Sequence, residues 1–404
     1  MTIDKVLQVS DIKPIHPFPA RMASSVVWES IPHNGGKLRV LDPMTGSGTT
    51  LVNLRAMGHQ AIGGDTDPLA LLIARSWCSD LDSDRLRYRA EIVLKKAIRL
   101  SENLVPERAY PSHIDLETKE FLDYWFDDTN RCQLAALARC ISRVRNYEER
   151  TLLWCAFSRL IITKKSGVSL AMDISHSRPH KKYENAPFRA FDKFLRSVDY
   201  IIHKAPFRKD NNYPAIILRQ ADARSLPFEC DSIDMVITSP PYLNAIDYIR
   251  GHKFSLVWMG YSIAALRSLR SNNIGAERSG NLDNINPFRE VIERMGYIER
   301  LNHRYRNIVL KYIIDMNSVI SECRRVTKKN GQVIFVIGDS MVGGIFVRNS
   351  EGIIRLAEIN GFKLSSKMTR SLPENRRYLP PPNLETSGWK MQSRMREEAV
   401  LYFN

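Results

Sequence analysis

One stretch of the chain decides its fold, namely Ile233-Asp234-Met235-Val236-Ile237-Thr238-Ser239-Pro240-Pro241-Tyr242. Its first part is apolar and rich in β-branched residues, and two prolines follow. This pattern is typical of a buried strand that leaves the sheet at the prolines, because proline cannot donate a ladder hydrogen bond. Open α/β sheets bind ligands at the carboxyl ends of their strands. We therefore expect Ser239 and Tyr242 to lie in a ligand-binding crevice.

The groups of this stretch are suited to activating an amino nitrogen. The exocyclic nitrogen of cytosine or adenine is a poor nucleophile, because its lone pair is delocalised into the ring. Two acceptors aimed at its N–H bonds, Ser239 Oγ and the Pro240 carbonyl, would favour a tetrahedral, nucleophilic nitrogen, and Pro241 holds the preceding residue extended. Tyr242 would offer a stacking face to a base flipped from its duplex, which costs a few kcal/mol. The alternative is that these residues form only a turn.

Size, composition and charge restrict the class of protein. The 404 residues, 44% hydrophobic and 25% charged, suit one large α/β domain with an insertion or two domains. We find no bilayer-spanning apolar run and no signal sequence, so we expect no membrane contact and a cytoplasmic protein. Six scattered cysteines without a Cys-x-x-Cys pair argue against a zinc site and a disulfide framework. The net charge of +15 indicates a polyanionic partner, most simply nucleic acid.

The N-terminal part contains a second strand with a glycine-rich end. Residues 37–41 predict a strand, and the segment that closes it and opens a helix is Asp42-Pro43-Met44-Thr45-Gly46-Ser47-Gly48-Thr49-Thr50. Gly46 and Gly48 permit a tight turn and close backbone approach to a ligand. The segment lacks the lysine of a P-loop and the G-x-G-x-x-G spacing of dinucleotide folds.

Two further residues near this segment have alternative interpretations. A strand at residues 61–65 ends on Asp65, which is placed either to accept hydrogen bonds from a ribose diol or to cap a helix, with Asp67 as a rival cap. Phe18, held by flanking prolines, packs either on a flat ligand or on the core.

At this point the chain resembles the S-adenosylmethionine-dependent amino-methyltransferases of DNA, which methylate cytosine N4 or adenine N6. Residues 42–50 look like their cofactor loop, Asp-Pro-Phe-x-Gly-Ser-Gly-Thr-Thr, with Met44 in the usual Phe place. Residues 238–242 match their Ser-Pro-Pro-Tyr motif, and residues 16–22 look like the segment beside the methionine end of the cofactor. The resemblance covers roughly residues 14–75 and 214–403.

The resemblance implies S-adenosylmethionine as cofactor and a role for each matched residue. Backbone around Gly46 and Gly48 would hold the methionyl part, Asp65 the ribose and Asp222 the adenine amino group. The absence of a Pro-Cys dipeptide argues against cytosine C5 methylation. The implied catalytic residues are Ser239, Pro240, Pro241 and Tyr242, and the implied cofactor-binding residues are Phe18, Asp42, Pro43, Met44, Gly46, Gly48, Thr49, Thr50, Asp65 and Asp222.

We expect a Rossmann-like methyltransferase fold of the α/β class, with a seven-stranded, mostly parallel sheet, an antiparallel last strand and helices on both faces. Residues 1–79 would form the cofactor-binding half of the domain and residues 214–404 the catalytic half. Residues 80–213 would form a mostly helical insertion, the candidate target-recognition region. Further strands are expected at residues 216–221, 333–339, 362–369 and 399–403, and helices at 83–104, 116–126, 132–145, 148–162, 304–326 and 353–360.

Basic segments offer candidate DNA contacts. The insertion becomes basic and broken from Lys164 onward, and this stretch would either track phosphates or form solvated loops. Its His176 and His180 lack partners at metal-ligand spacing. A second basic segment, which we interpret as a loop that closes over DNA, contains Arg267, Arg270 and Arg278, and residues near the motif that could line the base pocket are Asn244, Asp247, Tyr248, Arg250, His252 and Lys253.

The predicted function is site-specific methylation of double-stranded DNA at cytosine N4, by in-line attack of a flipped base. Adenine N6 is the first alternative, and an RNA methyltransferase or an inactive nucleic-acid-binding protein are more distant ones. The neutral Ser239 favours cytosine, because adenine enzymes more often carry Asp or Asn there. Such an enzyme would work near the nucleoid of a bacterium or archaeon, with a cognate restriction enzyme as a possible partner. The sequence leaves the recognition site and the oligomeric state open.

Overall fold

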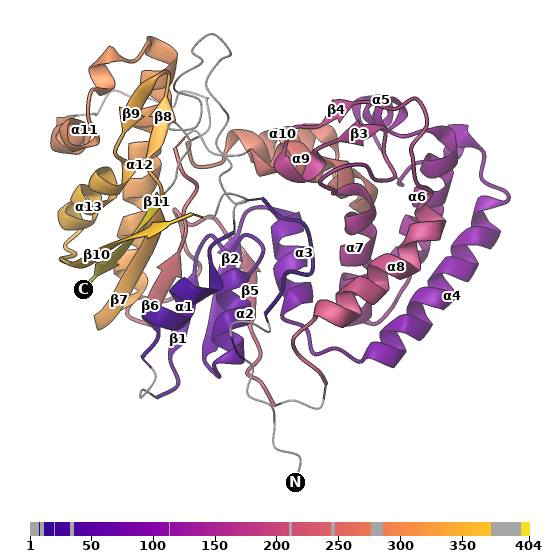
Figure 1. The fold of residues 1–404 in the computed structure, drawn as a ribbon, viewed down its shortest axis with the longest axis horizontal. Coiled ribbons are helices and arrows are strands. Elements are labelled where there is room, and N and C mark those ends of the chain that lie inside the picture. Colours follow the sequence, from indigo (N-terminus) through magenta and orange to yellow (C-terminus); the bar gives the residue numbers. More distant parts are fainter. Residues whose placement is uncertain are drawn as a thin grey trace.

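A seven-stranded sheet forms the centre of the protein (Figure 1). The computed structural model describes residues 8, 12–19, 21–32, 36–112, 114–209, 212–243, 247–275, 286–372 and 397–404. The strands of the sheet are β1 (Arg39–Asp42), β2 (Gln60–Asp65), β5 (Ile217–Gln220), β6 (Ile233–Thr238), β7 (Thr327–Ile337), β10 (Leu364–Ser371) and β11 (Glu397–Phe403). They lie in the order β10-β11-β7-β6-β1-β2-β5.

The sheet is parallel except for its last strand. β1 pairs in parallel with β2 and β6, β2 with β5, and β6 with β7, whereas β11 runs antiparallel to both β7 and β10. This is the Rossmann-like methyltransferase fold, and both the seven strands and the antiparallel last strand confirm the prediction. The strand order reverses between β1 and β6, which makes the carboxyl ends of these two strands the switch point where such sheets bind ligands.

The central strands are apolar because both faces of the sheet are covered. Val40 and Leu41 of β1 are fully buried but join different cores, since successive side chains point to opposite faces. One core contains α1 (Ser24–Ser30), α2 (Thr49–Ala56) and α3 (Pro68–Trp77), and the other contains α11 (Arg289–Met295), α12 (His303–Val326) and α13 (Asn349–Ile359).

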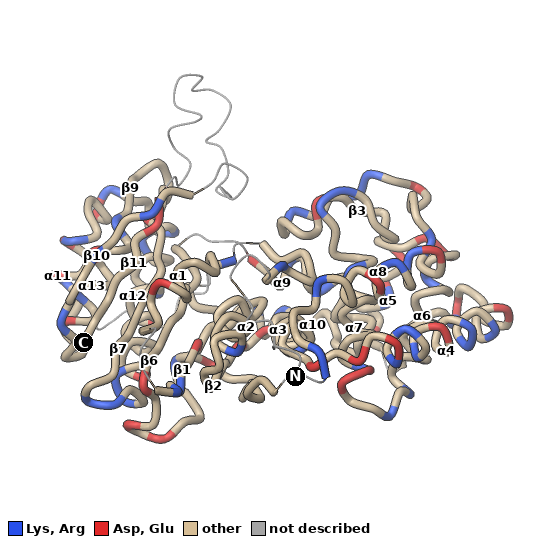
Figure 2. The backbone as a smooth tube through the Cα atoms, turned by 60° about the horizontal axis from the view of Figure 1, so that its bottom comes forward, with Lys and Arg blue, Asp and Glu red and all other residues tan. Residues whose placement is uncertain are grey.

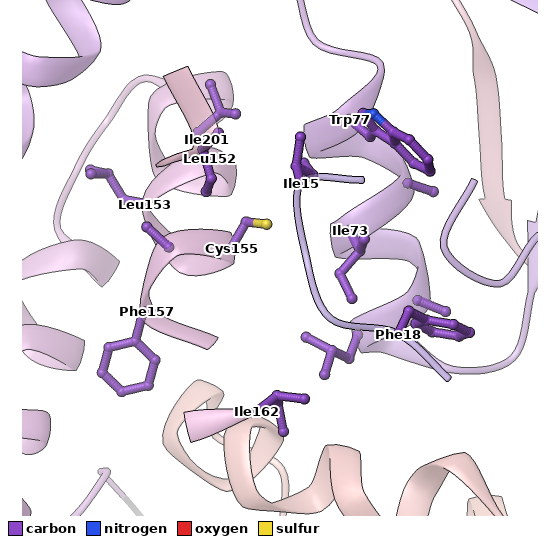
Figure 3. Packing of buried hydrophobic residues seen from close by; sticks show 14 of the residues in the cluster. Ile15, Phe18, Ile73, Trp77, Leu152, Leu153, Cys155, Phe157, Ile162 and Ile201 are labelled. Carbon is purple, nitrogen blue, oxygen red and sulfur yellow. The ribbon is translucent and has the colours of Figure 1, made fainter. Parts of the chain in front are cut away.

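A group of helices lies beside α3, on the right in Figure 1. Its members are α4 (Ser83–Ser101), α5 (Leu116–Trp125), α6 (Asp128–Ser142), α7 (Tyr147–Ile161) and α8 (Ala190–Lys204). Figure 3 shows Ile15 between Trp77 of α3 and Cys155 of α7. Arg159 on α7 donates to the Ile15 carbonyl at 2.6 Å, so the N-terminal segment joins the helices to the sheet.

The structure differs from the expectation in several elements. α8 occupies part of the stretch that we expected to be basic and broken, because Phe194, Val198 and Ile201 form one buried face. β7 begins at Thr327 rather than at residue 333, since Thr327 pairs with Ile233 across a shift in register. Two small hairpins were not expected, and their strands are β3 (Ala171–Met172) with β4 (His180–Lys181) and β8 (Ser340–Val342) with β9 (Ile345–Val347).

The remaining helices connect these layers. They are α9 (Tyr248–Leu256), α10 (Ile263–Ser271) and the 3-10 turns η2 (Pro106–Arg108), η3 (Ile174–His176), η4 (Val257–Met259), η5 (Asn286–Phe288) and η6 (Ile298–Arg300). Among the described residues, no helix combines the length and apolar character needed to span a membrane.

Candidate active site

The predicted site residues converge on one cavity at the switch point. The cavity has a volume of about 670 Å³ and lies where β1, β2 and β6 end. Every residue predicted to be catalytic or cofactor-binding lines it, with the exception of Gly48. Two loops distant in sequence therefore form one site, because β1 and β6 are neighbours in the sheet.

The two glycines of the loop after β1 face different neighbours. Gly46 has a φ of 52° and borders the cavity, where an added Cβ would lie 3.5 Å from the Phe18 ring. Gly48 has a φ of 89° and faces α3, so an added Cβ would lie 2.8 Å from Ala74. Gly48 thus permits close helix packing, and the structure places it against Ala74 rather than in the cavity wall.

Asp42 joins the two motifs. Its buried carboxylate accepts a hydrogen bond from Thr238 Oγ1 at 2.7 Å and one from the Met44 backbone N–H at 3.1 Å. Burial raises the pKa of Asp42 to about 6, although hydrogen bonds from Thr50 and Thr238 oppose the rise. This carboxylate holds the loop after β1 against the start of the motif after β6.

Asp65 is held by backbone groups at the mouth of the same loop. The Gly46 N–H donates to its Oδ2 at 2.7 Å, and the Asp67 N–H donates to its Oδ1 at 2.9 Å. Burial, helped by the nearby charge of Asp67, raises the pKa of Asp65 to about 7. Asp67 rather than Asp65 caps α3, since it accepts from the Leu69 N–H at 2.9 Å. The carboxylate of Asp65 is therefore not used as a helix cap.

Asp222 lines the cavity beside a residue that the sequence prediction missed. Arg224 donates to both carboxylate oxygens of Asp222, from Nε at 3.0 Å and from Nη2 at 2.7 Å. Burial opposes ionisation of Asp222, but these hydrogen bonds outweigh it and lower its pKa. Arg224 also reaches Asp315 of α12 at 2.9 Å. The arginine fixes a carboxylate at the cavity wall, and its position two residues after Asp222 was the only signal in the sequence.

Aromatic rings form the wall nearest the N-terminal segment. Phe18 is 9% exposed and stacks on Tyr248 of α9, with ring centroids 5.2 Å apart and planes inclined by 23°. The His252 ring lies 5.2 Å from Phe18, and its Nδ1 is hydrogen-bonded to Asp67. The sequence left open whether Phe18 packs on a ligand or on the core. In the structure Phe18 packs against other side chains of the protein and also borders the cavity.

The Ser-Pro-Pro-Tyr motif contacts the last two strands. Ser239 Oγ lies 3.4 Å from Tyr242 OH, which donates to Glu398 Oε2 on β11 at 3.1 Å. Arg370 on β10 donates to the other oxygen of Glu398 at 2.9 Å. Burial and the Glu398 charge raise the pKa of Tyr242, so its hydroxyl keeps its proton. Glu398 and Arg370 were not predicted, because Glu398 directly follows Glu397 and precedes the apolar run of β11, so the sequence does not distinguish the buried glutamate from the exposed one.

The segment between α7 and α8 and the helix α10 also contribute to the cavity. His176, Ser177 and Arg178 line it, and so do Arg267 and Arg270 of α10. Asp247, Tyr248 and Arg250 also line it, whereas Asn244 and Arg278 lie outside the described residues. Figure 2 shows Lys and Arg both on the sheet side and on the helical group. Within the described part of the chain, no three His, Cys, Asp or Glu side chains form a group that could hold a metal.

The cavity suits S-adenosylmethionine. Its volume of about 670 Å³ falls within the range of ligand sites, about 300–1,000 Å³. Gly46 leaves backbone exposed for a ligand, and the carboxylates of Asp65 and Asp222 can accept hydrogen bonds from hydroxyl and amino groups.

The chain is similar in sequence to several known methyltransferases. No family model matches the chain. It is 22% identical to the Type II methyltransferase M.MvaI of Kocuria varians over 370 residues, covering 86% of this chain and 80% of that protein. It is 24% identical to M.AvaI of a Nostoc species, covering 81% and 73%. It is also 21% identical to M.MjaII of Methanocaldococcus jannaschii, covering 79% and 74%.

A solved structure, a SAM-dependent methyltransferase from Methanosarcina mazei, aligns with 94% of this chain and 95% of its own, at 8% identity and a TM-score of 0.33. That score is low, and the fold class rests on the strand order instead. The strand order therefore defines the class of fold, the Rossmann-like methyltransferase fold, and the cavity lies at the switch point of its sheet. Within that class, its sequence similarity extends along most of the chain to Type II methyltransferases.

Proposed function

We propose that the protein is a site-specific DNA methyltransferase that modifies the exocyclic N4 amino group of cytosine. One observation carries the proposal: the Ser-Pro-Pro-Tyr motif and the glycine-rich loop line one cavity and are joined by the hydrogen bond from Thr238 to Asp42. The similarity to Type II methyltransferases and the net charge of +15 support DNA as the substrate. A restriction enzyme that recognises the same sequence is the proposed partner.

When bound, S-adenosylmethionine supplies a methyl group that its positively charged sulfur has already activated. The loop around Gly46, with Asp65 and Asp222, would hold this cofactor. Ser239 Oγ and the Pro240 carbonyl would accept hydrogen bonds from the amino group of the flipped base and direct its lone pair toward the methyl group. Catalysis then comes mainly from position and orientation, because a bound pair at the correct angle avoids the entropy cost of meeting in solution.

Cytosine rather than adenine is proposed because this position holds Ser239, whereas adenine enzymes more often carry Asp or Asn there. Adenine N6 remains the alternative for the same site. Both reactions need two acceptors for one amino group, and the cavity offers the same two in either case.

The test is a methyl-transfer assay on DNA with labelled cofactor, followed by chromatography of the digested nucleosides. We expect label in N4-methylcytosine. Label only in N6-methyladenine would contradict the choice of base, and label in RNA but not in DNA would contradict the substrate. The variant Ser239→Ala should bind cofactor within about twofold of wild type and turn over about 100-fold more slowly, because it removes one of two orienting acceptors.

A further inference from the structure

A hydrogen-bonded chain leads from the motif to a buried carboxylate. Ser239 Oγ lies 3.4 Å from Tyr242 OH, and Tyr242 OH lies 3.1 Å from Glu398 Oε2. Glu398 is 6% exposed and comes from β11, far along the chain from the motif. All three side chains line the cavity. The carboxylate is therefore part of the site, although neither motif contains it.

The chemistry of these groups fixes the direction of the chain. A carboxylate paired with an arginine only accepts hydrogen bonds, so Tyr242 must donate its proton to Glu398. The oxygen of Tyr242 is then available to accept from the Ser239 hydroxyl. Ser239 in turn presents its lone pairs to the cavity. Each hydroxyl group polarises the next one, and the O–H bonds of Ser239 and Tyr242 both point away from the position of the substrate and toward Glu398.

Methylation of an amino group requires a group that accepts a proton from the nitrogen. Given the proposed function, the amino nitrogen uses its lone pair to bond the methyl carbon while the carbon–sulfur bond breaks. Sulfur keeps that electron pair and becomes neutral, so the nitrogen carries the positive charge. The product forms when this nitrogen loses one proton.

We propose that Glu398 accepts this proton through Tyr242 and Ser239, and that it also positions both hydroxyls. The nitrogen passes its proton to Ser239 Oγ, Ser239 passes its own to Tyr242, and Tyr242 passes its own to Glu398. Each oxygen gains one proton and loses one, except that of Glu398, which ends as a neutral carboxyl group. The positive charge thus leaves the nitrogen and neutralises a buried negative charge.

The other carboxylates of the cavity are bound elsewhere. Among the described residues, Asp42 accepts from Thr238, Asp65 from two backbone N–H groups, and Asp222 from Arg224. Asp67 accepts from the Leu69 N–H and is hydrogen-bonded to His252, and Asp247 accepts from the Arg250 N–H and pairs with Arg270. None of these hydrogen bonds leads to Ser239. Glu398 is thus the acid that the described hydrogen bonds connect to the catalytic serine.

The experiment measures single-turnover methyl transfer to DNA by wild type, Glu398→Gln and Tyr242→Phe. Gln keeps the size and one acceptor for Tyr242 but does not take up the proton, and Phe removes the middle of the chain. We expect the single-turnover rate constant to fall about 100-fold in each variant, and steady-state assays should give a KM for DNA and for cofactor within about twofold of wild type. Glu397→Gln is the matched control, because its exposed side chain precedes Glu398 on the same strand, and its single-turnover rate constant should be unchanged.

Two further variants separate proton transfer from simple packing. The double variant Tyr242→Phe with Glu398→Gln should be no slower than either single one, because both break the same chain. Glu398→Asp should recover part of the rate, since it restores a carboxylate one methylene shorter. The proton path would be contradicted if the double variant lost the product of the two single-variant rate losses. It would also be contradicted if Glu398→Asp were as slow as Glu398→Gln.

The outcomes also separate this inference from the proposed function. If wild type methylates no DNA, the proposed function fails. If wild type methylates DNA and Glu398→Gln or Tyr242→Phe keeps the full single-turnover rate constant, only the role of Glu398 is overturned. If Glu398→Gln does not fold, as judged by thermal melting, the folded Tyr242→Phe variant decides between the two results.

Discussion

Asp65 illustrates how a single residue can make cofactor binding depend on pH. Its pKa is raised to about 7 by burial and by the charge of Asp67. If Asp65 accepts hydrogen bonds from a ribose diol, its ionised form binds better, so the complex favours loss of the proton. Cofactor affinity should then rise from about pH 6 to about pH 8 and level off above, because the free protein holds the proton below its pKa of about 7. Calorimetric titration with S-adenosylmethionine across this range tests the expectation.

The variant Asp65→Asn is the control for this dependence. It should bind cofactor more weakly and without the rise, since an amide does not titrate. It should also lower the free energy of unfolding by about 1–3 kcal/mol, because both oxygens of Asp65 accept backbone N–H groups and an amide supplies one acceptor only. A rise with pH of equal size in the variant would exclude Asp65 as its source.

At the scale of elements, Arg55 of α2 holds both ends of the helical group. Its guanidinium is buried, pairs with both oxygens of Asp80 at 2.7 Å and donates to the Pro214 carbonyl at 2.7 Å. It also lies 4.3 Å from the centre of the Phe207 ring. Asp80 precedes α4, and Phe207 and Pro214 follow α8, so one side chain joins the sheet domain to both connections.

Arg55→Met should therefore destabilise the protein strongly. Met keeps most of the apolar packing of Arg55 but makes none of its hydrogen bonds. We expect the free energy of unfolding to fall by about 3 kcal/mol, which is the lower end of the range for removing one partner of a buried ion pair. Asp80→Asn should cost less, because the amide keeps one acceptor for Arg55, which also keeps its hydrogen bond to the Pro214 carbonyl. Urea denaturation measures both. A loss of less than about 1 kcal/mol for Arg55→Met would show that the connections do not depend on it.

The elements that could be predicted are those whose signal is local. β1 and β6 were predicted because an apolar run ends at a proline or a glycine-rich turn, and the residues that end them form the cavity. α8 was missed although its signal is also local. Phe194, Val198 and Ile201 recur at the spacing of one helix face, and the basic residues of the segment drew attention away from this pattern.

The site residues that could not be predicted are those whose partner is distant in the chain. Glu398 meets Tyr242 only because β11 inserts between β7 and β10. Arg55 meets Asp80 and Phe207 only after the helices have packed. Gly48 matched a cofactor motif, but its contact with Ala74 required the position of α3. The motifs in the sequence therefore predicted the residues at the carboxyl ends of the strands. The residues that pack around them could be identified only from the structure.

At the scale of the whole molecule, the net charge of +15 predicts salt-dependent binding to DNA. Arg267 and Arg270 lie on α10 at the cavity wall, where a duplex would approach a flipped base. Replacing both with Gln should weaken DNA binding and reduce the slope of log affinity against log salt by about 1 to 2, since each phosphate contact contributes about one. Fluorescence anisotropy with a labelled duplex at several salt concentrations measures the slope.

Arg289→Gln is the matched control for this experiment. Arg289 lies on α11, which packs on the opposite face of the sheet from α2 and α3, and its side chain is 85% exposed and paired with Glu293. Arg289→Gln should therefore leave the slope of log affinity against log salt unchanged. Equal slopes for wild type and the Arg267 and Arg270 variant would place the phosphate contacts elsewhere.

The most direct measurement is a genome-wide map of modified bases by single-molecule sequencing, after expression of wild type and of Ser239→Ala in a host that lacks the modification. We expect N4-methylcytosine at one short sequence motif with wild type, and a much smaller modified fraction of the same sites with Ser239→Ala at equal, low expression. The same modification with both proteins, or no modified base with wild type, would contradict the claim that this cavity methylates DNA through Ser239.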